Sequence, residues 1–425
     1  MNLKIYLKNT FLRNVFVVMF GTAIAQAIPV LISPLLTRIY SPSDFAVFSL
    51  YLSVLNTLSI IITGRYELAI ILPKYEKAAL IILKISLFIT AILSFVFFIF
   101  FIFFSNSLAQ LLGNNNISRW LLVLPLSLLL TGVFQSLSYW LTKEKNYTAI
   151  SKTRLIQSLT GVLFTILLGF IPIISGGLVF GNIIGLLIAV IFSVIIIYPS
   201  IKKNFWDSSK SKLKLYALKY IDFPKYNAFS SLVNAIGIYI PLWYISSVFN
   251  AETTGYYGLA TRIIAIPLML FSSSVSQVYY KKAADIFNSK QDLYKFTKNL
   301  FLKCLSIAIL PLMILVFLAP YLFNIVFGAK WYEAGRMSQY IAVGIFVQVI
   351  ISPFTGVFAI IDKLKVVMIW QFLYLVSNVV FIYINQLFFK NALTSYLLLY
   401  SLMNILLYSI YLFMILNQLK KISYA

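Results

Sequence analysis

The chain has 425 residues, of which 61% are hydrophobic and 11% are charged, and its mean hydropathy is +0.94. A soluble domain averages about 45–50% apolar and about 25% charged residues, so this composition excludes an ordinary soluble globular protein. The sequence has no histidine and one cysteine, Cys304, which excludes Ser-His-Asp and Cys-His nucleophiles, His-based zinc motifs and an internal disulfide. We therefore expect an all-α membrane protein that holds no metal and no other cofactor.

Twelve stretches of the chain contain about 20 mostly apolar residues, the length that crosses a bilayer as a helix. The third of them includes Leu87–Phe104, which is apolar on every helical face, so much of this helix should meet lipid. The twelve predicted spans are 15–36, 45–63, 79–104, 119–141, 155–174, 177–199, 228–249, 256–279, 300–323, 338–361, 366–387 and 394–416.

Basic residues are unequally shared between the two sides that these spans define. The side of the amino terminus carries 28 of the 34 basic residues, the other side carries five, and Arg262 lies within a span. Cytoplasmic loops carry the excess of lysine and arginine, so both termini are predicted to lie in the cytoplasm. The net charge of +23 is thereby assigned to topology and to membrane lipids rather than to nucleic acid.

The first span also carries a possible processing signal. Residues Ala23–Ala27 have the small-residue spacing of a signal-peptidase site. Because the apolar run continues past the usual length of a signal peptide, we expect an uncleaved anchor.

The spans fall into two sets of six on either side of a basic segment. Pro34 in the first half matches Pro241 in the second, and Tyr40–Asp44 matches Phe249–Thr253. An even number of spans in each half predicts parallel repeats related by an axis along the membrane normal. The predicted units are an amino-terminal lobe, a cytoplasmic basic linker and a carboxy-terminal lobe, at 1–200, 201–227 and 228–425.

Four stretches resemble bacterial Wzx-type O-antigen flippases: LLTRIYSPSDFAVFSLYLSVLNTLSIIITGRYELAIILP (35–73), YALKYIDFPKYNAFSSLVNA (216–235), NAETTGYYGLATRIIAIPLMLFSSSVSQVYYKKAAD (250–285) and YLFNIVFGAKWYEAG (321–335). The resemblance implies the fold of the multidrug/oligosaccharidyl-lipid/polysaccharide exporter superfamily, in which two six-helix lobes surround a central cavity. It also implies alternating-access translocation of undecaprenyl-pyrophosphate-linked O-antigen units from the cytoplasmic to the periplasmic leaflet, for lipopolysaccharide biosynthesis. The O-antigen polymerase and chain-length machinery would then be partners of a functional monomer.

The same motifs leave the cargo open, because another lipid-linked polysaccharide precursor fits them as well. Two other classes fit less well. A multidrug exporter of cations would place a carboxylate within the membrane, whereas all eleven carboxylates here lie in loops or at span edges. A membrane glycosyltransferase or polymerase needs an acidic pair or base near an outside loop, where only Asp44, Glu252 and Glu333 are found. We therefore predict that the chain is not an enzyme.

Four cations are candidate ligands of the pyrophosphate, since arginine and lysine bind phosphate oxygens strongly where the dielectric constant is low. They are Arg262, Arg65, Arg38 and Lys84. The alternative for Arg262, Arg38 and Lys84 is that they extend toward lipid headgroups. For Arg65 the alternative is a local pair with Glu67.

Neutral polar residues within the spans are candidates to hydrogen-bond sugar hydroxyls, with interhelical hydrogen bonds as the alternative. The residues singled out for a cavity are Gln26, Asn56, Asn234, Gln277 and Gln348. Trp140, Trp243 and Trp370 can stack on sugar rings, or belong to the aromatic belts at the membrane surfaces.

The charge distribution gives a topology prediction. Reporter fusions after residues 145, 212 and 290 should behave as cytoplasmic, and fusions after residues 110, 252 and 332 as periplasmic. Alkaline phosphatase and fluorescent-protein fusions measure this directly. A periplasmic signal from the segment 201–227 would contradict the twelve-span topology.

Overall fold

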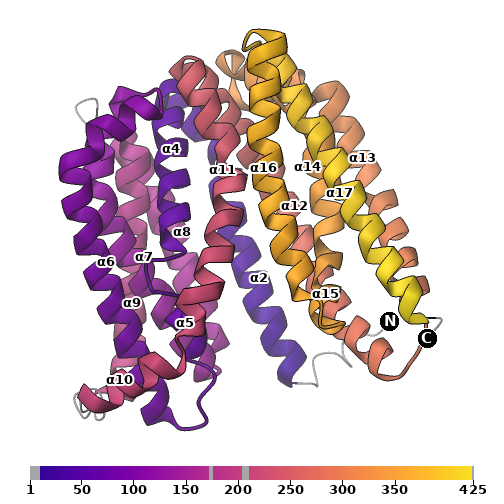
Figure 1. Cartoon of the computed structure of the whole chain (residues 1–425). Helices are drawn as coiled ribbons and strands as arrows, with labels where there is room; N and C mark the ends of the chain where they lie inside the picture. Colours follow the sequence, from indigo (N-terminus) through magenta and orange to yellow (C-terminus); the bar gives the residue numbers. More distant parts are fainter. Residues whose placement is uncertain (1–9, 172–175, 203–209, 424–425) are drawn as a thin grey trace. The chain divides into compact units, whose positions relative to one another are not determined.

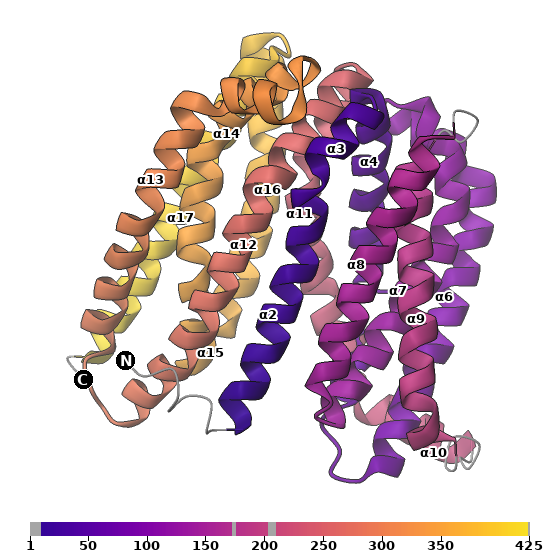
Figure 2. The same ribbon diagram turned by 180° about the vertical axis from the view of Figure 1, so that it is seen from behind.

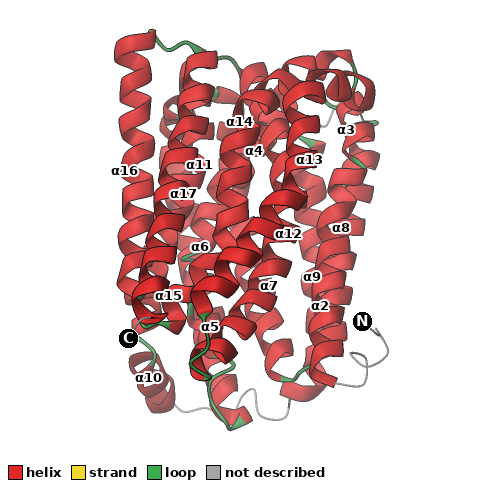
Figure 3. Cartoon of the chain, turned by 90° about the vertical axis from the view of Figure 1, so that its right-hand side faces the viewer, coloured by secondary structure: helices red, strands yellow, loops and turns green. Residues whose placement is uncertain are grey.

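The computed structural model describes residues 10–171, 176–202 and 210–423, which are helical and contain no strand (Figure 3). Twelve long helices occur in these ranges: α2 (Thr10–Leu31), α4 (Pro42–Ser59), α6 (Glu76–Leu111), α7 (Ser118–Lys143), α8 (Tyr147–Gly169), α9 (Gly177–Ile201), α11 (Phe229–Val248), α12 (Ala251–Asn288), α13 (Leu293–Phe327), α14 (Tyr332–Ile351), α16 (Leu364–Phe389) and α17 (Leu393–Ser423). The shorter α-helices are α3 (Ser33–Ile39), α5 (Tyr66–Ala69), α10 (Lys210–Lys219) and α15 (Val357–Ile360).

Each predicted span overlaps one of the long helices, so the all-α, multi-pass fold class is confirmed. Among the described residues, ten helical stretches are long and apolar enough to cross a membrane, and they involve every long helix except α4 and α8. These two carry more polar residues: α4 begins with Pro42–Asp44, and the first turns of α8 contain Lys152 and Arg154.

The chain divides into two compact units, residues 1–235 and 236–425. In the first unit, α8 packs between α2 and α9, and α7 packs against α6 and α9 (Figures 1 and 2). In the second unit, α14 packs against α12, α13 and α17. The predicted linker 201–227 contains α10, which packs on α6 of the first unit; residues 203–209 of this linker lie outside the described ranges.

The two matched stretches of sequence begin corresponding helices in the two units. Ser41 is the N-cap of α4, where its hydroxyl accepts a hydrogen bond from the Asp44 backbone N–H and Asp44 completes a capping box. Asn250 is the N-cap of α12, and its side chain accepts from the backbone N–H of Thr253. The predicted match therefore aligns two caps that satisfy the first N–H groups of a helix by the same geometry.

The core of the first unit lies where α6, α7 and α5 meet. Trp140 and Leu141 on α7 are fully buried against Ala79–Ile85 of α6, together with Tyr66 of α5. The rest of α6 exposes large apolar side chains such as Phe103, which is 73% exposed. A helix that buries one end and exposes phenylalanine along the other is stable only if lipid covers it.

The second unit has a core rich in tyrosine and asparagine. The hydroxyl of Tyr374 on α16 donates to Asn404 Oδ1 on α17 at 3.3 Å, and Asn385 Nδ2 donates to the Tyr244 hydroxyl at 3.0 Å. Trp370 stacks on Tyr411 with ring centroids 4.1 Å apart. The two hydrogen bonds satisfy the donor and acceptor atoms that they join between helices where water is excluded.

Glycines allow α8 and α9 to pack closely in the first unit. A Cβ on Gly185 would lie 2.5 Å from the Gln157 carbonyl oxygen and 2.6 Å from the Gly161 Cα atom. A Cβ on Gly181 would lie 2.1 Å from the Thr165 hydroxyl. The glycines of α9 are thus a helix-packing feature of the small-residue kind that membrane helices use.

These contacts predict opposite outcomes for two alanine substitutions in one interface. Gly185→Ala should destabilise the protein by about 1–3 kcal/mol, because its Cβ meets backbone atoms that cannot move aside. Gly161→Ala is the matched control, because its Cβ would be 3.5 Å from the nearest atom, an ordinary contact. Thermal unfolding of both variants in detergent measures the difference. Equal melting temperatures would contradict the packing described for these helices.

Candidate functional site

The helix of the second predicted span ends before the span does, and turns follow it. Helix α4 ends at Ser59, the chain then makes successive turns, and the short helix α5 follows at Tyr66–Ala69. Gly64 and Arg65 both have a left-handed backbone, with φ of 59° and 60°. An arginine in this conformation costs on the order of 1–3 kcal/mol, so the surrounding structure must hold the turn in place.

This turn buries a carboxylate. Glu67 is 2% exposed, and the Thr63 hydroxyl donates a hydrogen bond to its Oε2 atom. Arg65 Nη1 lies 3.7 Å from Glu67 Oε1. Burial raises the pKa of Glu67 above its usual value, although the Thr63 hydrogen bond and the Arg65 charge oppose this shift. The expected pair between Arg65 and Glu67 is therefore present in the structure.

The pair with Glu67 does not use all the hydrogen-bond donors of Arg65. Its side chain is 21% exposed, and its Nε atom is buried and has no hydrogen-bond partner among the described residues. A buried guanidinium N–H group without an acceptor is costly. Because its side chain is partly exposed, the Arg65 guanidinium can still donate to a further oxygen ligand while it remains close to Glu67.

A second arginine belongs to the same region. Arg154 on α8 is half-buried, and its Nη1 donates to the Thr22 hydroxyl on α2 at 2.6 Å. Tyr139 on α7 lies close enough to Glu67, Arg65 and Arg154 for their charges to act on its hydroxyl. We call Arg65, Glu67, Tyr139 and Arg154 the Arg65–Arg154 cluster. It contains two guanidinium groups and one carboxylate, and so carries at least one excess positive charge.

Sequence reasoning missed Arg154 because it assigned this residue to a cytoplasmic loop. The predicted span began at residue 155, whereas α8 begins at Tyr147, two turns earlier. The Asn146 side chain caps this start by accepting from the Ala149 N–H at 3.2 Å. That capping pattern was the sequence signal that could have placed Arg154 inside a helix.

The other predicted cations lie in different environments. Arg38 is exposed in the last turn of α3, where a cation is favoured by the helix dipole. Lys84 is half-buried on α6, between buried residues of the core. Arg262 is half-buried on α12, in the second unit. Of the four predicted cations, Arg65 is the one the structure places in the Arg65–Arg154 cluster.

The predicted neutral residues are also dispersed. Gln26 is exposed on α2, four residues after Thr22 and so on the same helix face as the Arg154 partner. Gln348 hydrogen-bonds Tyr408, which is the interhelical alternative. The remaining three are exposed or half-buried on α4, α11 and α12: Asn56, Asn234 and Gln277.

Two of the three predicted tryptophans are buried and make contacts within the protein. Trp140 is fully buried, and its indole N–H donates to Glu144 Oε1 at 2.9 Å. Trp370 is 7% exposed and stacks on Tyr411. Stacking of these two indoles on a sugar is therefore not supported, because protein groups already cover their faces.

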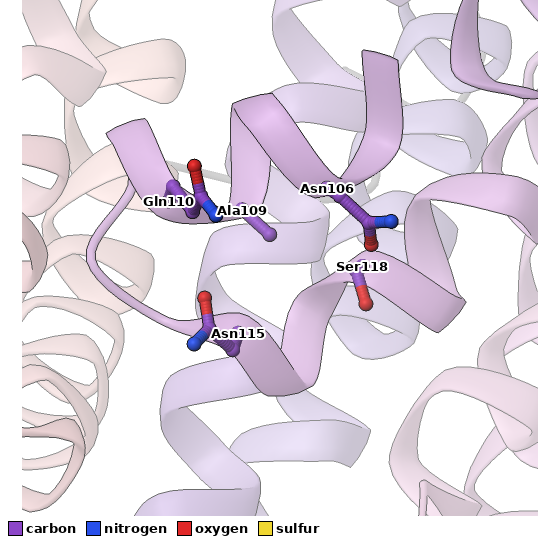
Figure 4. Close-up of a pocket in the computed structure, with 5 residues that line it drawn as sticks. All are labelled: Asn106, Ala109, Gln110, Asn115 and Ser118. Carbon is purple, nitrogen blue, oxygen red and sulfur yellow. The ribbon is translucent and has the colours of Figure 1, made fainter. Parts of the chain in front are cut away.

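A small polar pocket lies where α6 ends and α7 begins (Figure 4). It has a volume of about 280 Å³ and is lined by Asn106, Ala109, Gln110, Asn115 and Ser118. Amide and hydroxyl groups line it and no charged side chain does. Among the described residues, no group of three or more Cys, Asp or Glu side chains could hold a metal ion.

The described residues form an all-helical, multi-pass membrane protein, and its fold is similar to the folds of solved transporters. A multidrug resistance MATE family transporter of the MOP superfamily, solved in an inward-facing conformation, aligns with a TM-score of 0.73 at 13% identity, over 95% of this chain and 98% of that one. The lipid II flippase MurJ, in an inward closed conformation, aligns with a TM-score of 0.71 at 17% identity, over 97% of this chain and 90% of that one.

The chain belongs to the polysaccharide biosynthesis protein family, whose sequence model matches residues 35–336. It is also similar to the teichuronic acid biosynthesis protein TuaB of Bacillus subtilis (strain 168), with 24% identity over 244 residues. This match covers 54% of the chain and 47% of TuaB, so the chain spans about half the length of that relative.

The buried carboxylate predicts a pH-dependent stability difference. Because burial raises the pKa of Glu67, the protonated form is favoured in the folded state, and ionisation subtracts stability as the pH rises through the window between the usual and the raised pKa. Glu67→Gln removes this loss. The difference in melting temperature between this variant and the wild type should therefore move in favour of the variant across the window, and it should stay constant above it.

Glu333→Gln is the control, because Glu333 is an exposed carboxylate paired with Arg336 at 3.3 Å. Its melting temperature should follow that of the wild type at each pH. Thermal unfolding in detergent between acid and neutral pH measures both variants. If the melting temperatures of Glu67→Gln and the wild type change with pH in parallel, burial does not raise the pKa of Glu67.

Proposed function

We propose that the protein is a flippase that moves an undecaprenyl-pyrophosphate-linked O-antigen repeat unit from the cytoplasmic to the periplasmic leaflet of the inner membrane, by alternating access. The observation that carries this proposal is the Arg65–Arg154 cluster at the interrupted second span of a polysaccharide biosynthesis family member.

The chemistry of the cluster fits the charged part of such a cargo. A lipid-linked diphosphate carries negative charge and oxygen acceptors, which guanidinium forks bind in bidentate fashion. The Arg65 Nε atom offers a buried donor without an acceptor among the described residues. Arg154 is held by one bond to Thr22 and keeps further donors for a ligand. A diphosphate at this place would neutralise the excess positive charge of the cluster.

The rest of the cargo needs little from charged groups. A prenyl chain is as apolar as the bilayer and can remain in lipid while the headgroup crosses. Sugar hydroxyls need neutral donors and acceptors, and Gln26 on the Thr22 face of α2 is the nearest predicted candidate in sequence. No coupling ion is part of the proposal.

Another lipid-linked polysaccharide precursor is the second candidate cargo. The similarity to TuaB, a protein of teichuronic acid biosynthesis, favours it, since that polymer differs from O-antigen. Both cargoes would present the same lipid-diphosphate group to the cluster. A multidrug cation is disfavoured, because the cluster has an excess of positive charge and would repel it.

Reconstituted vesicles test the proposal. The purified protein in proteoliposomes should move a fluorescent undecaprenyl-pyrophosphate oligosaccharide between leaflets, measured as the fraction accessible to a membrane-impermeant quencher. Lengthening of the saccharide during the assay would indicate a polymerase instead. In cells with a known O-antigen, deletion of the gene should leave single lipid-linked units in the cytoplasmic leaflet. Translocation of a cationic dye but not of the lipid-linked sugar would overturn the proposal.

Substitutions in the cluster should reduce translocation without loss of protein. Arg65→Gln and Arg154→Gln each remove charge-assisted hydrogen bonds worth about 1.5–3 kcal/mol, so the rate should fall by about tenfold to a hundredfold. Lysine at either position should restore part of the rate, because the charge remains but the fork is lost. Arg119→Gln, an exposed arginine at the start of α7, is the matched control and should keep the wild-type rate.

Arg262 on α12 gives a separate prediction for the second unit. An arginine inside a span costs about 2.5–3.5 kcal/mol on insertion scales, which favours a role in binding the anion. Arg262→Ala should abolish export of O-antigen while protein abundance stays normal, and Arg262→Lys should keep part of it. Immunoblots of surface polysaccharide measure export. Normal export by an abundant Arg262→Ala variant would mean that Arg262 has no part in binding the anion.

A further inference from the structure

Helix α10 (Lys210–Lys219) presents two opposite apolar faces. Its inner face packs on the core of the first unit through four partly buried side chains, Leu213, Tyr216, Ala217 and Tyr220. On the opposite face, Leu215 is 63% exposed and Leu218 is 60% exposed. Packing within the first unit therefore explains the inner face and leaves the outer face uncovered by that unit.

Lysines flank the two exposed leucines. At 100° per residue, Leu215 and Leu218 lie near the middle of the exposed arc, Lys214 lies at one edge, and Lys212 and Lys219 lie at the other. All three lysines are exposed. The Lys219 ammonium lies 5.6 Å from the centroid of the Tyr220 ring, which holds it beside the helix rather than over the leucines.

This arrangement is that of a helix lying in a membrane interface. Leucines in the centre of the face enter the boundary between headgroups and acyl chains, while lysine stems on either side carry their charges to the headgroups. The loop before α6 has the same composition, with Leu72 55% exposed and Tyr75 80% exposed beside the exposed Lys74. Basic residues next to an apolar face select anionic lipids by charge complementarity.

We propose that the outer face of α10 is a binding surface for anionic phospholipid headgroups, formed by Leu215 and Leu218 between Lys212, Lys214 and Lys219. Binding there stabilises the turn that carries Arg65. The Tyr66 hydroxyl donates to the Ala217 carbonyl oxygen at 2.8 Å, and Tyr66 belongs to the core on which α10 packs. Figure 1 shows α5 and α10 at the same end of the first unit.

A fluorescent reporter on α10 tests the lipid selectivity. Bimane is attached to Leu218→Cys in a Cys304→Ser background, and the full chain is reconstituted in phosphatidylcholine vesicles. Increasing amounts of a quencher lipid are then added. It is either phosphatidylglycerol or phosphatidylcholine, and each is brominated on the part of the acyl chain nearest the headgroup. Each lysine near a surface favours anionic lipid by on the order of fivefold, so brominated phosphatidylglycerol should quench at a concentration at least about tenfold lower than brominated phosphatidylcholine.

The lysines are tested by charge removal. Lys212→Gln, Lys214→Gln and Lys219→Gln together should reduce the preference for phosphatidylglycerol to less than about twofold while leaving quenching by phosphatidylcholine. The matched control removes three exposed lysines from α13, as Lys295→Gln, Lys298→Gln and Lys303→Gln, and should keep the preference. High salt should also weaken it, because these charges are exposed to solvent.

Two results would overturn the proposal. Equal quenching by both lipids would mean that α10 lies in the interface without recognising anionic headgroups. Absence of quenching by either lipid would mean that its outer face meets water or another protein. A second reporter, bimane on Leu215→Cys, must show the same lipid preference. Agreement between the two sites excludes an effect of one label on the helix.

Discussion

Removing a charge from water costs several kcal/mol unless partners replace the lost hydration, and this constraint shapes the first unit. Glu67 is buried at a turn, where the Thr63 hydroxyl and the Arg65 guanidinium partly compensate it. The turn itself requires Arg65 to adopt a left-handed backbone, which an isolated segment would not keep. Tyr66 supplies the restraint, because it is buried in the core of α6 and α7 and bonds to α10. The charged cluster therefore depends on the apolar packing below it.

The two units share the start of their second helix and then differ. Ser41 and Asn250 cap α4 and α12 in the same way. Helix α12 then continues unbroken to Asn288, whereas α4 ends at Ser59 and gives way to turns. A helix satisfies its own backbone groups in lipid, so an interruption is tolerated only where side chains or water replace those bonds. The interruption in the first unit is thus a specialisation, and it is the place where the Arg65–Arg154 cluster forms.

Much of the fold could be predicted from the sequence, because hydropathy over about 20 residues depends on composition and not on partners. All twelve predicted spans overlap helices, and the match of Tyr40–Asp44 with Phe249–Thr253 aligned two real caps. The pair of Arg65 with Glu67 could also be predicted, since the two residues are close in sequence. The position of Arg154 within α8 could be predicted from the Asn146 cap, but its hydrogen bond to Thr22 on α2 could not, because the two residues are 132 positions apart in sequence. Long-range contacts of this kind leave no local pattern.

The balance of charge in the cluster bears on what a cargo must supply. The Glu67 carboxylate lies near Arg65 and limits the cost of holding a guanidinium away from water. The carboxylate cannot neutralise both arginines, and the Arg65 Nε atom still lacks an acceptor among the described residues. A neutral sugar would leave this excess charge unchanged, and a cation would increase it. The lipid-linked diphosphate of the proposed function would supply both negative charge and oxygen acceptors, so under that proposal the anionic group, rather than the saccharide, determines binding at this place.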